Sequence, residues 1–304
     1  MDLNDSCKHF IWSNKCDILL DENYNSINIM ICGNKSGLCK KALEKIRKVR
    51  KKYREYKFLS NCSSNAFTYR NDLTYSFDGL IDPLNVTKKS LKLSMTFIHS
   101  LRSIKPTLEF YNNKKTHDFF FYIGSLTIPD CKGIKTTRKF ISILCDKNLK
   151  GIVVSEDYVN DKKIFRKYIK AEQLKIYNHL DQITFFQKIS MCKISIFPNI
   201  VDAFPKLIIE SLLLNNVCIV NEKLLMGLNY LKNINSCFIK NFNKNTIVDT
   251  IETVCNELEL YSPREEFLEI YSSTHISKIW AKIINKKFNK QYKQIFHLKY
   301  INYY

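Results

Sequence analysis

Short apolar runs alternate with amphipathic stretches between residues 119 and 222, and this alternation constrains the fold more than any other feature. The runs expected to form strands are FFFYIGSL (119–126), GIVVSED (151–157), LKIYNHL (174–180), KISIFPN (193–199) and NVCIVNE (216–222). The stretches expected to form helices lie between them, at 132–147, 161–172, 183–192 and 205–215. This order predicts a doubly wound α/β domain, with a parallel sheet covered on both faces.

The first part of the chain predicts a smaller α/β domain. Residues 27–33 (INIMICG) and 56–60 (YKFLS) are apolar runs expected to form strands, and a basic helix is expected at 38–53. A strand around 73–79 and a helix at 87–103 are expected to follow, and 111–118 is expected to form a linker. The predicted domains are 1–115, a small acceptor-side α/β domain; 116–285, a Rossmann-like donor domain; and 286–304, a basic tail or helix.

The amino-acid composition limits which cellular compartment and which partners are expected. The 304 residues suffice for two domains, and no apolar run is long enough to cross a membrane. The N-terminus lacks the basic-then-apolar order of a signal peptide. The 11 cysteines are scattered without a C-x-x-C pair, which predicts reduced thiols in a cytoplasmic protein and no metal site. The net charge of +19 favours polyanionic partners.

The densest basic run is KKALEKIRKVRKKYREYK, residues 40–57. On a helix, its apolar residues repeat every three or four positions and form one stripe, with lysines and arginines covering the rest. Three interpretations stay open: a solvated helix with one buried stripe, a helix lying on an anionic membrane, and a nucleic-acid contact. The last is the weakest, because no nucleic-acid-binding signature accompanies the run, so no specific nucleic acid is expected.

Residues 199–210 (NIVDAFPKLIIE) carry the most chemistry. Pro205 suits the first turn of a helix, and the N–H groups that follow it would point beyond the preceding strand at an anion, with Lys206 adding positive charge. Asp202 in the loop could face the same cleft or simply cap the helix. Glu210 could be solvated, but its apolar neighbours indicate a carboxylate that needs a partner.

The segment KISIFPNIVDAFPKLIIESLLLNNVCIV (193–220) resembles the donor-binding segment of the group 1 (family 4) glycosyltransferases. Their pattern is a strand, E-G-F-P or E-G-F-G, and a helix with a second Glu eight residues after the first; here Asp202 and Glu210 match the two acids. FFFYIGSLTIPDCKG (119–133) resembles the family's strand-G-R-L-x-x-x-K-G element, 174–198 its base-binding segment, 75–85 the opening of its C-terminal domain, and 275–288 its closing helix.

The resemblance implies a GT-B-like α/β fold of two Rossmann-type domains, the N-terminal one reduced. It implies transfer of a sugar from a nucleotide diphosphate sugar to a hydroxyl of a glycan, lipid or protein-linked acceptor. Configuration would be retained, with no metal or other cofactor. Lys132, Asp202 and Glu210 would be catalytic. The expected donor-binding residues are Gly124, Ser125, Gly133, His179, Leu180, Ala203, Phe204, Pro205, Lys206 and Leu207, with His179 and Leu180 near the base.

Three departures from the family pattern bear on activity. Ser125 replaces the Arg of G-R-L, residues 155–157 (Ser-Glu-Asp) replace a Gly-x-Gly and add negative charge, and Asp202 is one methylene shorter than Glu. The N-terminal domain is short, and its acceptor-side histidine is unplaced. By residue type, the candidates for that histidine are His9, His99 and His117. The alternatives are a catalytically degenerate GT-B homologue acting as a binding or scaffold protein, and a polyanion-binding protein driven by net charge.

Overall fold

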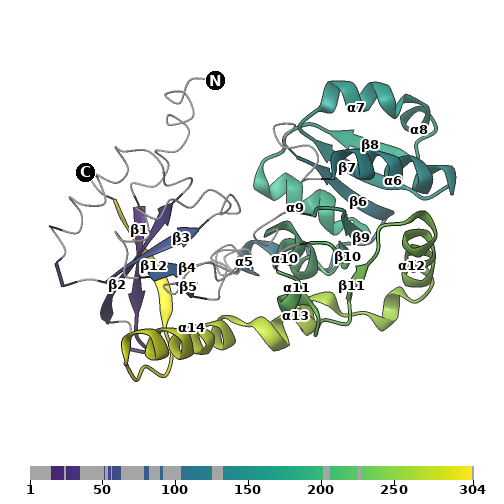
Figure 1. Ribbon diagram of the computed structural model, residues 1–304. Coiled ribbons are helices and arrows are strands. Elements are labelled where there is room, and N and C mark those ends of the chain that lie inside the picture. The colour runs from purple at the N-terminus through teal and green to yellow at the C-terminus, as the bar shows by residue number, and fades with distance from the viewer. Residues whose placement is uncertain are drawn as a thin grey trace. The chain divides into compact units, whose positions relative to one another are not determined.

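A computed structural model (Figure 1) describes residues 15–23, 25–34, 51, 54–55, 57–62, 79–81, 90–91, 104–124, 133–200, 206–224 and 227–302. The chain divides into two compact units, one of residues 1–98 and 271–304 and one of residues 99–270. The predicted boundaries differ from this division: they place 99–115 in the N-terminal domain, 271–285 in the donor domain, and 286–304 in a separate tail or helix, whereas Phe296–Asn302 form a strand. In the part of the chain so described, no helix is both long enough and apolar enough to cross a bilayer.

The unit of residues 99–270 is built on a six-stranded parallel sheet. Its strands are β6 (His117–Ile123), β7 (Gly151–Ser155), β8 (Leu174–Tyr177), β9 (Cys192–Phe197), β10 (Val217–Asn221) and β11 (Cys237–Lys240). Their spatial order is β11-β10-β9-β6-β7-β8: the chain starts at the centre, runs outward to β8, returns to β9 beside β6, and runs outward again. This is the strand order of a dinucleotide-binding Rossmann sheet.

Helices cover both faces of this sheet, as predicted (Figure 1). They are α5 (Ile104–Thr107), α6 (Ile134–Asp146), α7 (Tyr158–Ile164), α8 (Arg166–Lys170), α9 (Gln182–Ser190), α10 (Lys206–Leu213), α11 (Leu228–Leu231), α12 (Lys244–Asn256), the 3-10 turn η3 (Leu258–Leu260) and α13 (Pro263–Tyr271). Alternate strand residues face opposite sides. Phe119 and Phe121 pack with α6, α8 and α12, whereas Phe120 packs with α9.

One predicted helix is divided. The stretch 161–172 was expected to form a single helix, but α7 ends at Ile164 and α8 begins at Arg166, with Phe165 between them at φ −96° and ψ 15°. Phe165 is completely buried and packs in the core with Tyr168. The break therefore lies where the chain turns an aromatic side chain inward.

The other unit contains a mixed sheet in the order β12-β1-β2-β3-β4-β5. Its elements are β1 (Lys15–Leu20), β2 (Ser26–Asn34), β3 (Lys57–Cys62), β4 (Gly79–Ile81), β5 (Ser90–Leu91), β12 (Phe296–Asn302) and helix α14 (Ser273–Phe288). The strands β2 to β5 are parallel, as expected for 27–33 and 56–60, whereas β1 pairs antiparallel with both β2 and β12.

Two helices were expected in this region, at 87–103 and at 38–53. The predicted helix at 87–103 is wrong at residues 90–91, which form β5 and pair with β4. The next described helix, α5, begins only at Ile104 and contains Pro106. Of the predicted basic helix at 38–53, only residue 51 lies within the described residues.

Candidate functional site

The switch in chain direction between β6 and β9 creates the most favourable place for a ligand. These strands are neighbours in the sheet, yet α6 follows β6 on one face and α10 follows β9 on the other. In such sheets a crevice opens at the carboxyl ends of the two strands. Gly124 and Gly133 follow β6, and Lys206, Leu207 and Glu210 follow β9. The predicted residues Ser125, Lys132, Asp202, Ala203, Phe204 and Pro205 lie outside the described residues.

Gly133 lies against Pro198, the residue that follows β9. It is the N-cap of α6 and has φ 66°, a left-handed conformation that favours glycine. A Cβ on Gly133 would lie only 2.9 Å from the carbonyl oxygen of Pro198. The Oγ1 of Thr137 donates a hydrogen bond to the Gly133 carbonyl oxygen at 2.9 Å. The glycine is therefore required by both its backbone conformation and its close neighbour.

Asn221 fixes the same carbonyl from the next strand. It ends β10, is 5% exposed, and donates from Nδ2 to the Pro198 carbonyl oxygen at 3.0 Å. Its Oδ1 accepts from the N–H of Lys223 at 3.0 Å. Gly133 and Asn221, which come from different parts of the carboxyl edge, thus both lie against the Pro198 carbonyl. Sequence reasoning missed Asn221, although an amide that ends an apolar buried strand signals a side chain in need of partners.

Glu210 is a buried carboxylate in the second turn of α10. The residue is 6% exposed, and its Oε1 lies 2.9 Å from the Nζ of Lys206 one turn earlier. The expectation that Glu210 needs a partner is confirmed. Lys206 therefore offsets an acid of its own helix, rather than simply adding positive charge. The Leu207 side chain packs against the core beside α9. A carboxylate can accept hydrogen bonds from hydroxyls, and the first turn of a helix can donate N–H groups to an anion.

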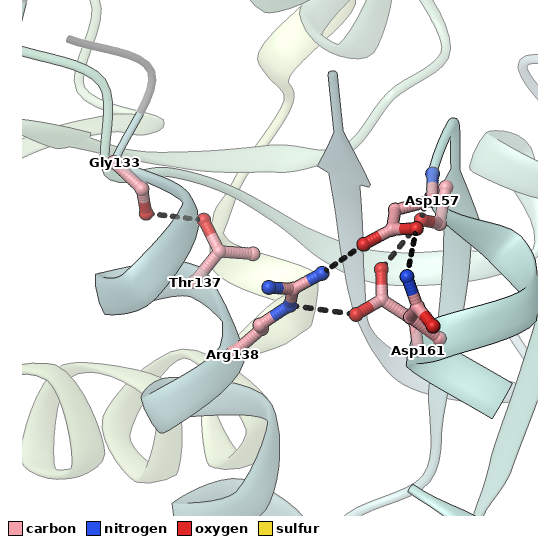
Figure 2. Close-up of polar contacts among 7 residues, drawn as sticks. Gly133, Thr137, Arg138, Asp157 and Asp161 are labelled. Carbon is pink, nitrogen blue, oxygen red and sulfur yellow. Dashed lines mark hydrogen bonds and ion pairs between the residues drawn. The ribbon is translucent and has the colours of Figure 1, made fainter. Parts of the chain in front are cut away.

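The carboxyl end of β7 holds a cluster of ion pairs (Figure 2). Arg138 on α6 donates from Nη2 to Asp157 Oδ2 and from Nε to Asp161 Oδ1, each at 2.7 Å. Ser155 Oγ donates to the other Asp161 oxygen at 2.5 Å, and Asn160 Nδ2 donates to Asp157 Oδ1 at 2.8 Å. Asp161 is completely buried. Arg138, the residue after Thr137 on α6, thus offsets the charge of both Asp157 and Asp161.

The remaining acid of this loop, Glu156, is tied to the central strand. Tyr122 on β6 donates its hydroxyl to Glu156 Oε1 at 2.6 Å, and its ring packs edge-on against Phe185 of α9, with centroids 6.0 Å apart. Burial, the hydrogen bond to Glu156 and the negative charge of Glu156 together raise the pKa of the Tyr122 hydroxyl. The extra negative charge expected from residues 155–157 is therefore held by specific partners.

The predicted base-binding residues lie at the edge of the sheet. His179 and Leu180 follow β8, which is separated from β6 by β7. His179 is exposed, and Leu180 packs in the core beside α9. The next residue, Asp181, caps α9 by accepting from the N–H groups of Ile183 and Thr184 at 3.0 Å.

Of the three histidines considered for the acceptor side, only His117 is described by the structure. It begins β6, at the opposite end of the strand from Gly124, and is 7% exposed. Its Nδ1 lies 2.8 Å from Thr116 Oγ1, and burial, followed by the charge of Lys175, lowers its pKa. This position at the amino edge separates His117 from the switch-point crevice. Within the described ranges, no group of three His, Cys, Asp or Glu side chains is arranged to hold a metal ion.

Comparison with protein-family models and with curated protein sequences finds no match. Solved structures do match. TarM of S. aureus has a TM-score of 0.57 at 15% identity over 84% of this chain and 54% of that chain. A glycosyltransferase from Rickettsia africae has a TM-score of 0.55 at 12% identity over 85% and 84% of the two chains. HepE of Anabaena, in complex with UDP and glucose, has a TM-score of 0.51 at 12% identity over 79% and 80%.

These matches show the fold. The chain has the α/β architecture of GT-B glycosyltransferases, and that prediction is confirmed. Its length spans about half of the TarM chain it matches.

Proposed function

We propose that this protein is a glycosyltransferase that takes a sugar from a nucleotide diphosphate sugar and transfers it to a hydroxyl acceptor. The observation that carries the proposal is Glu210, a carboxylate only 6% exposed, on the helix that follows the switch-point strand β9. A buried acid beside a helix N-terminus suits a ligand that combines hydroxyls with a diphosphate. The GT-B architecture supports the same substrate class.

The roles follow from the chemistry of the donor. Glu210 would accept hydrogen bonds from the ribose hydroxyls. Lys132 and the N–H groups after Asp202 would stabilise the negative charge that develops on the leaving diphosphate. Asp202 would face the sugar, and His179 and Leu180 would lie near the base. Retention of configuration, independence of metals and membership of family 4 remain parts of the proposal that rest on sequence resemblance.

Uridine diphosphate is the first nucleotide to test. Three similar proteins were crystallised with it: TarM, HepE and the pneumococcal O-GlcNAc transferase GtfA. The acceptor is proposed only as a hydroxyl on a glycan, a lipid or a protein-linked group. A cytoplasmic location, and peripheral contact with an anionic membrane through residues 40–57, also remain proposals.

The test is thermal unfolding of the full chain with UDP, GDP, ADP and CDP, for wild type, Glu210→Gln and a control, Glu252→Gln. Glu252 lies on α12 with its side chain 53% exposed, and its nearest lysine nitrogen is 4.0 Å away. A nucleotide at about 100 times its Kd adds ~2.7 kcal/mol to the free energy of unfolding. We expect UDP to stabilise wild type and Glu252→Gln, and to have a much smaller effect on Glu210→Gln.

The outcomes separate the proposals. If no nucleotide stabilises the folded wild-type protein, the proposed donor site is wrong. If UDP binds through Glu210 but no UDP-sugar is turned over with or without added acceptors, the chain is the degenerate homologue, which the loss of the G-R-L arginine at Ser125 favours.

A further inference from the structure

The outer face of α7 and α8 carries a basic stripe, which we define as Lys163, Arg166 and Lys170. Inward-facing residues fix the orientation of this segment: Asp161, Phe165 and Tyr168 are 0%, 0% and 5% exposed and recur at intervals of four and three. The residues on the opposite side of the same helical turns are Val159 and the basic stripe, and all four are exposed. The two short helices, consecutive in the chain (Figure 1), thus present one continuous outer face.

In the part of the chain that the structure describes, no ion pair joins a residue of the basic stripe to an acid. Among the residues that the structure describes, the neighbouring acids Asp157 and Asp161 are both bound by Arg138 on the inner side. The ion pair found on the outer side of α7 and α8 joins Lys167 to Asp146 at 3.2 Å, and it does not involve the basic stripe. An anionic surface would therefore meet three unpaired cations in a row.

Exposed apolar side chains flank the stripe. Val159 is 63% exposed and Ile164 is 51% exposed, and both lie on α7. Basic residues with apolar side chains beside them suit the interface of an anionic bilayer, where the cations meet the headgroups and the apolar groups enter the acyl boundary. A soluble polyanion would use the cations alone.

A second basic helix face in the same chain lacks the apolar component. Lys278, Lys282 and Lys286 lie on α14, are exposed, and repeat every four residues. Among the described residues of α14, no large apolar side chain is exposed. The two faces carry comparable charge and differ in exposed apolar area, so α14 provides a matched comparison.

We propose that the outer face of α7 and α8 binds the surface of a membrane that contains anionic lipid. It is distinct from the basic run at 40–57, and it does not depend on the proposed transferase activity. Each basic residue near an anionic membrane contributes roughly a fivefold increase in partition. Three of them predict roughly a 100-fold effect, which is within the range of a direct measurement.

The experiment is co-flotation of the full chain with vesicles of phosphatidylcholine alone and of an equimolar mixture with phosphatidylglycerol. We expect binding to the mixed vesicles, roughly 100-fold weaker for Lys163→Gln/Arg166→Gln/Lys170→Gln. The control Lys278→Gln/Lys282→Gln/Lys286→Gln removes the same net charge and should bind nearly as wild type does. Thermal unfolding of each variant confirms that it is folded.

The pair Val159→Ser/Ile164→Ser distinguishes a membrane from a soluble polyanion. We expect it to weaken vesicle binding about tenfold, because apolar area no longer leaves water, while binding to heparin stays unchanged. The proposal is overturned by any of three results: no binding to mixed vesicles, equal losses in the two triple-glutamine variants, or vesicle binding that is unaffected in the serine pair.

Discussion

The Nε of Arg138 donates to Oδ1 of Asp161 at 2.7 Å, joining the second turn of α6 to the buried side of α7. Asp161 is completely buried, so Arg138→Met would leave a carboxylate without its cation in the interior. Breaking a buried pair costs about 3–5 kcal/mol, and the partial exposure of Arg138, 26% for its side chain, favours the lower end. We expect about 3 kcal/mol from urea unfolding.

A double-mutant cycle checks this interpretation. Adding Asp161→Asn to Arg138→Met should recover part of the loss, because the second change removes the unpaired charge. Simple addition of the two single losses would show that the two side chains do not act as a pair.

Gly133→Ala should destabilise the fold because alanine fits neither the backbone nor the space. The left-handed conformation, with φ 66°, costs about 1–2 kcal/mol for a residue with a Cβ. The contact at 2.9 Å between the new Cβ and the Pro198 carbonyl oxygen adds to this cost, because relieving it requires the backbone to shift. We expect a loss of about 2 kcal/mol or more, measured as a lower Tm and a lower urea midpoint.

Gly124→Ala is the control for this substitution. The nearest atom to its Cβ would be Cε1 of Tyr122 at 3.3 Å, a side-chain atom, and Gly124 is not among the glycines with positive φ. Equal losses for the two variants would argue against a special role for the Gly133–Pro198 contact.

Lys115 should make stability depend on pH. Its Nζ donates to the Leu214 carbonyl oxygen at 3.1 Å and to Asn216 Oδ1 at 2.7 Å, and burial lowers its pKa from 10.5 to about 8. Between these values the unfolded chain binds more protons than the folded chain, so the free energy of unfolding rises with pH. From about pH 7 to about pH 10 the expected gain is on the order of 2 kcal/mol.

The comparison with Lys115→Met isolates this contribution from the other titrating lysines. The difference in free energy of unfolding, wild type minus variant, should increase across that pH range. Burial raises the pKa of the Cys192 and Cys218 thiols, so ionisation of these thiols in the unfolded chain lowers the free energy of unfolding as pH rises. Both proteins contain these thiols, so their contribution largely cancels in the difference. A difference that stays constant with pH would show that the lysine ionises alike in both states.

The parallel sheet of residues 99–270 could be predicted because local sequence pattern and tertiary burial agree there. Strands such as β7 and β10 are apolar at nearly every position, since both faces of the sheet are covered. Helices such as α6 show the expected one-sided burial. The break at Phe165 could not be predicted in this way, because the buried residues on its two sides keep the spacing of a single helix.

Pairing between distant segments was not predictable from local sequence. The strand β5 has only two residues, and its hydrogen bonds to β4 depend on the whole sheet being in place. Similarly, β1 and β12 carry no signal that they are neighbours. The helix predicted at 87–103 was therefore favoured by local propensity over a short strand that only tertiary structure makes stable.

In the candidate site, too, features set by local sequence could be predicted, whereas contacts between distant segments could not. The burial of Glu210 followed from its apolar neighbours, and its need for a partner followed from the cost of a buried charge. The contacts that hold the loops together, from Asn221 to Pro198 and from Arg138 to Asp157, join residues from different strands and helices. Nothing in their local spacing indicates that they meet.

The pairing of β12 with β1 has a consequence for how the chain is made. The final strand of the mixed sheet is translated only after residues 99–270, which form a compact unit of their own. Ribosome-bound chains can therefore complete the Rossmann sheet before β12 has been synthesised and can pair with β1. The later part of the sequence is expected to fold first, and the earlier part to finish last.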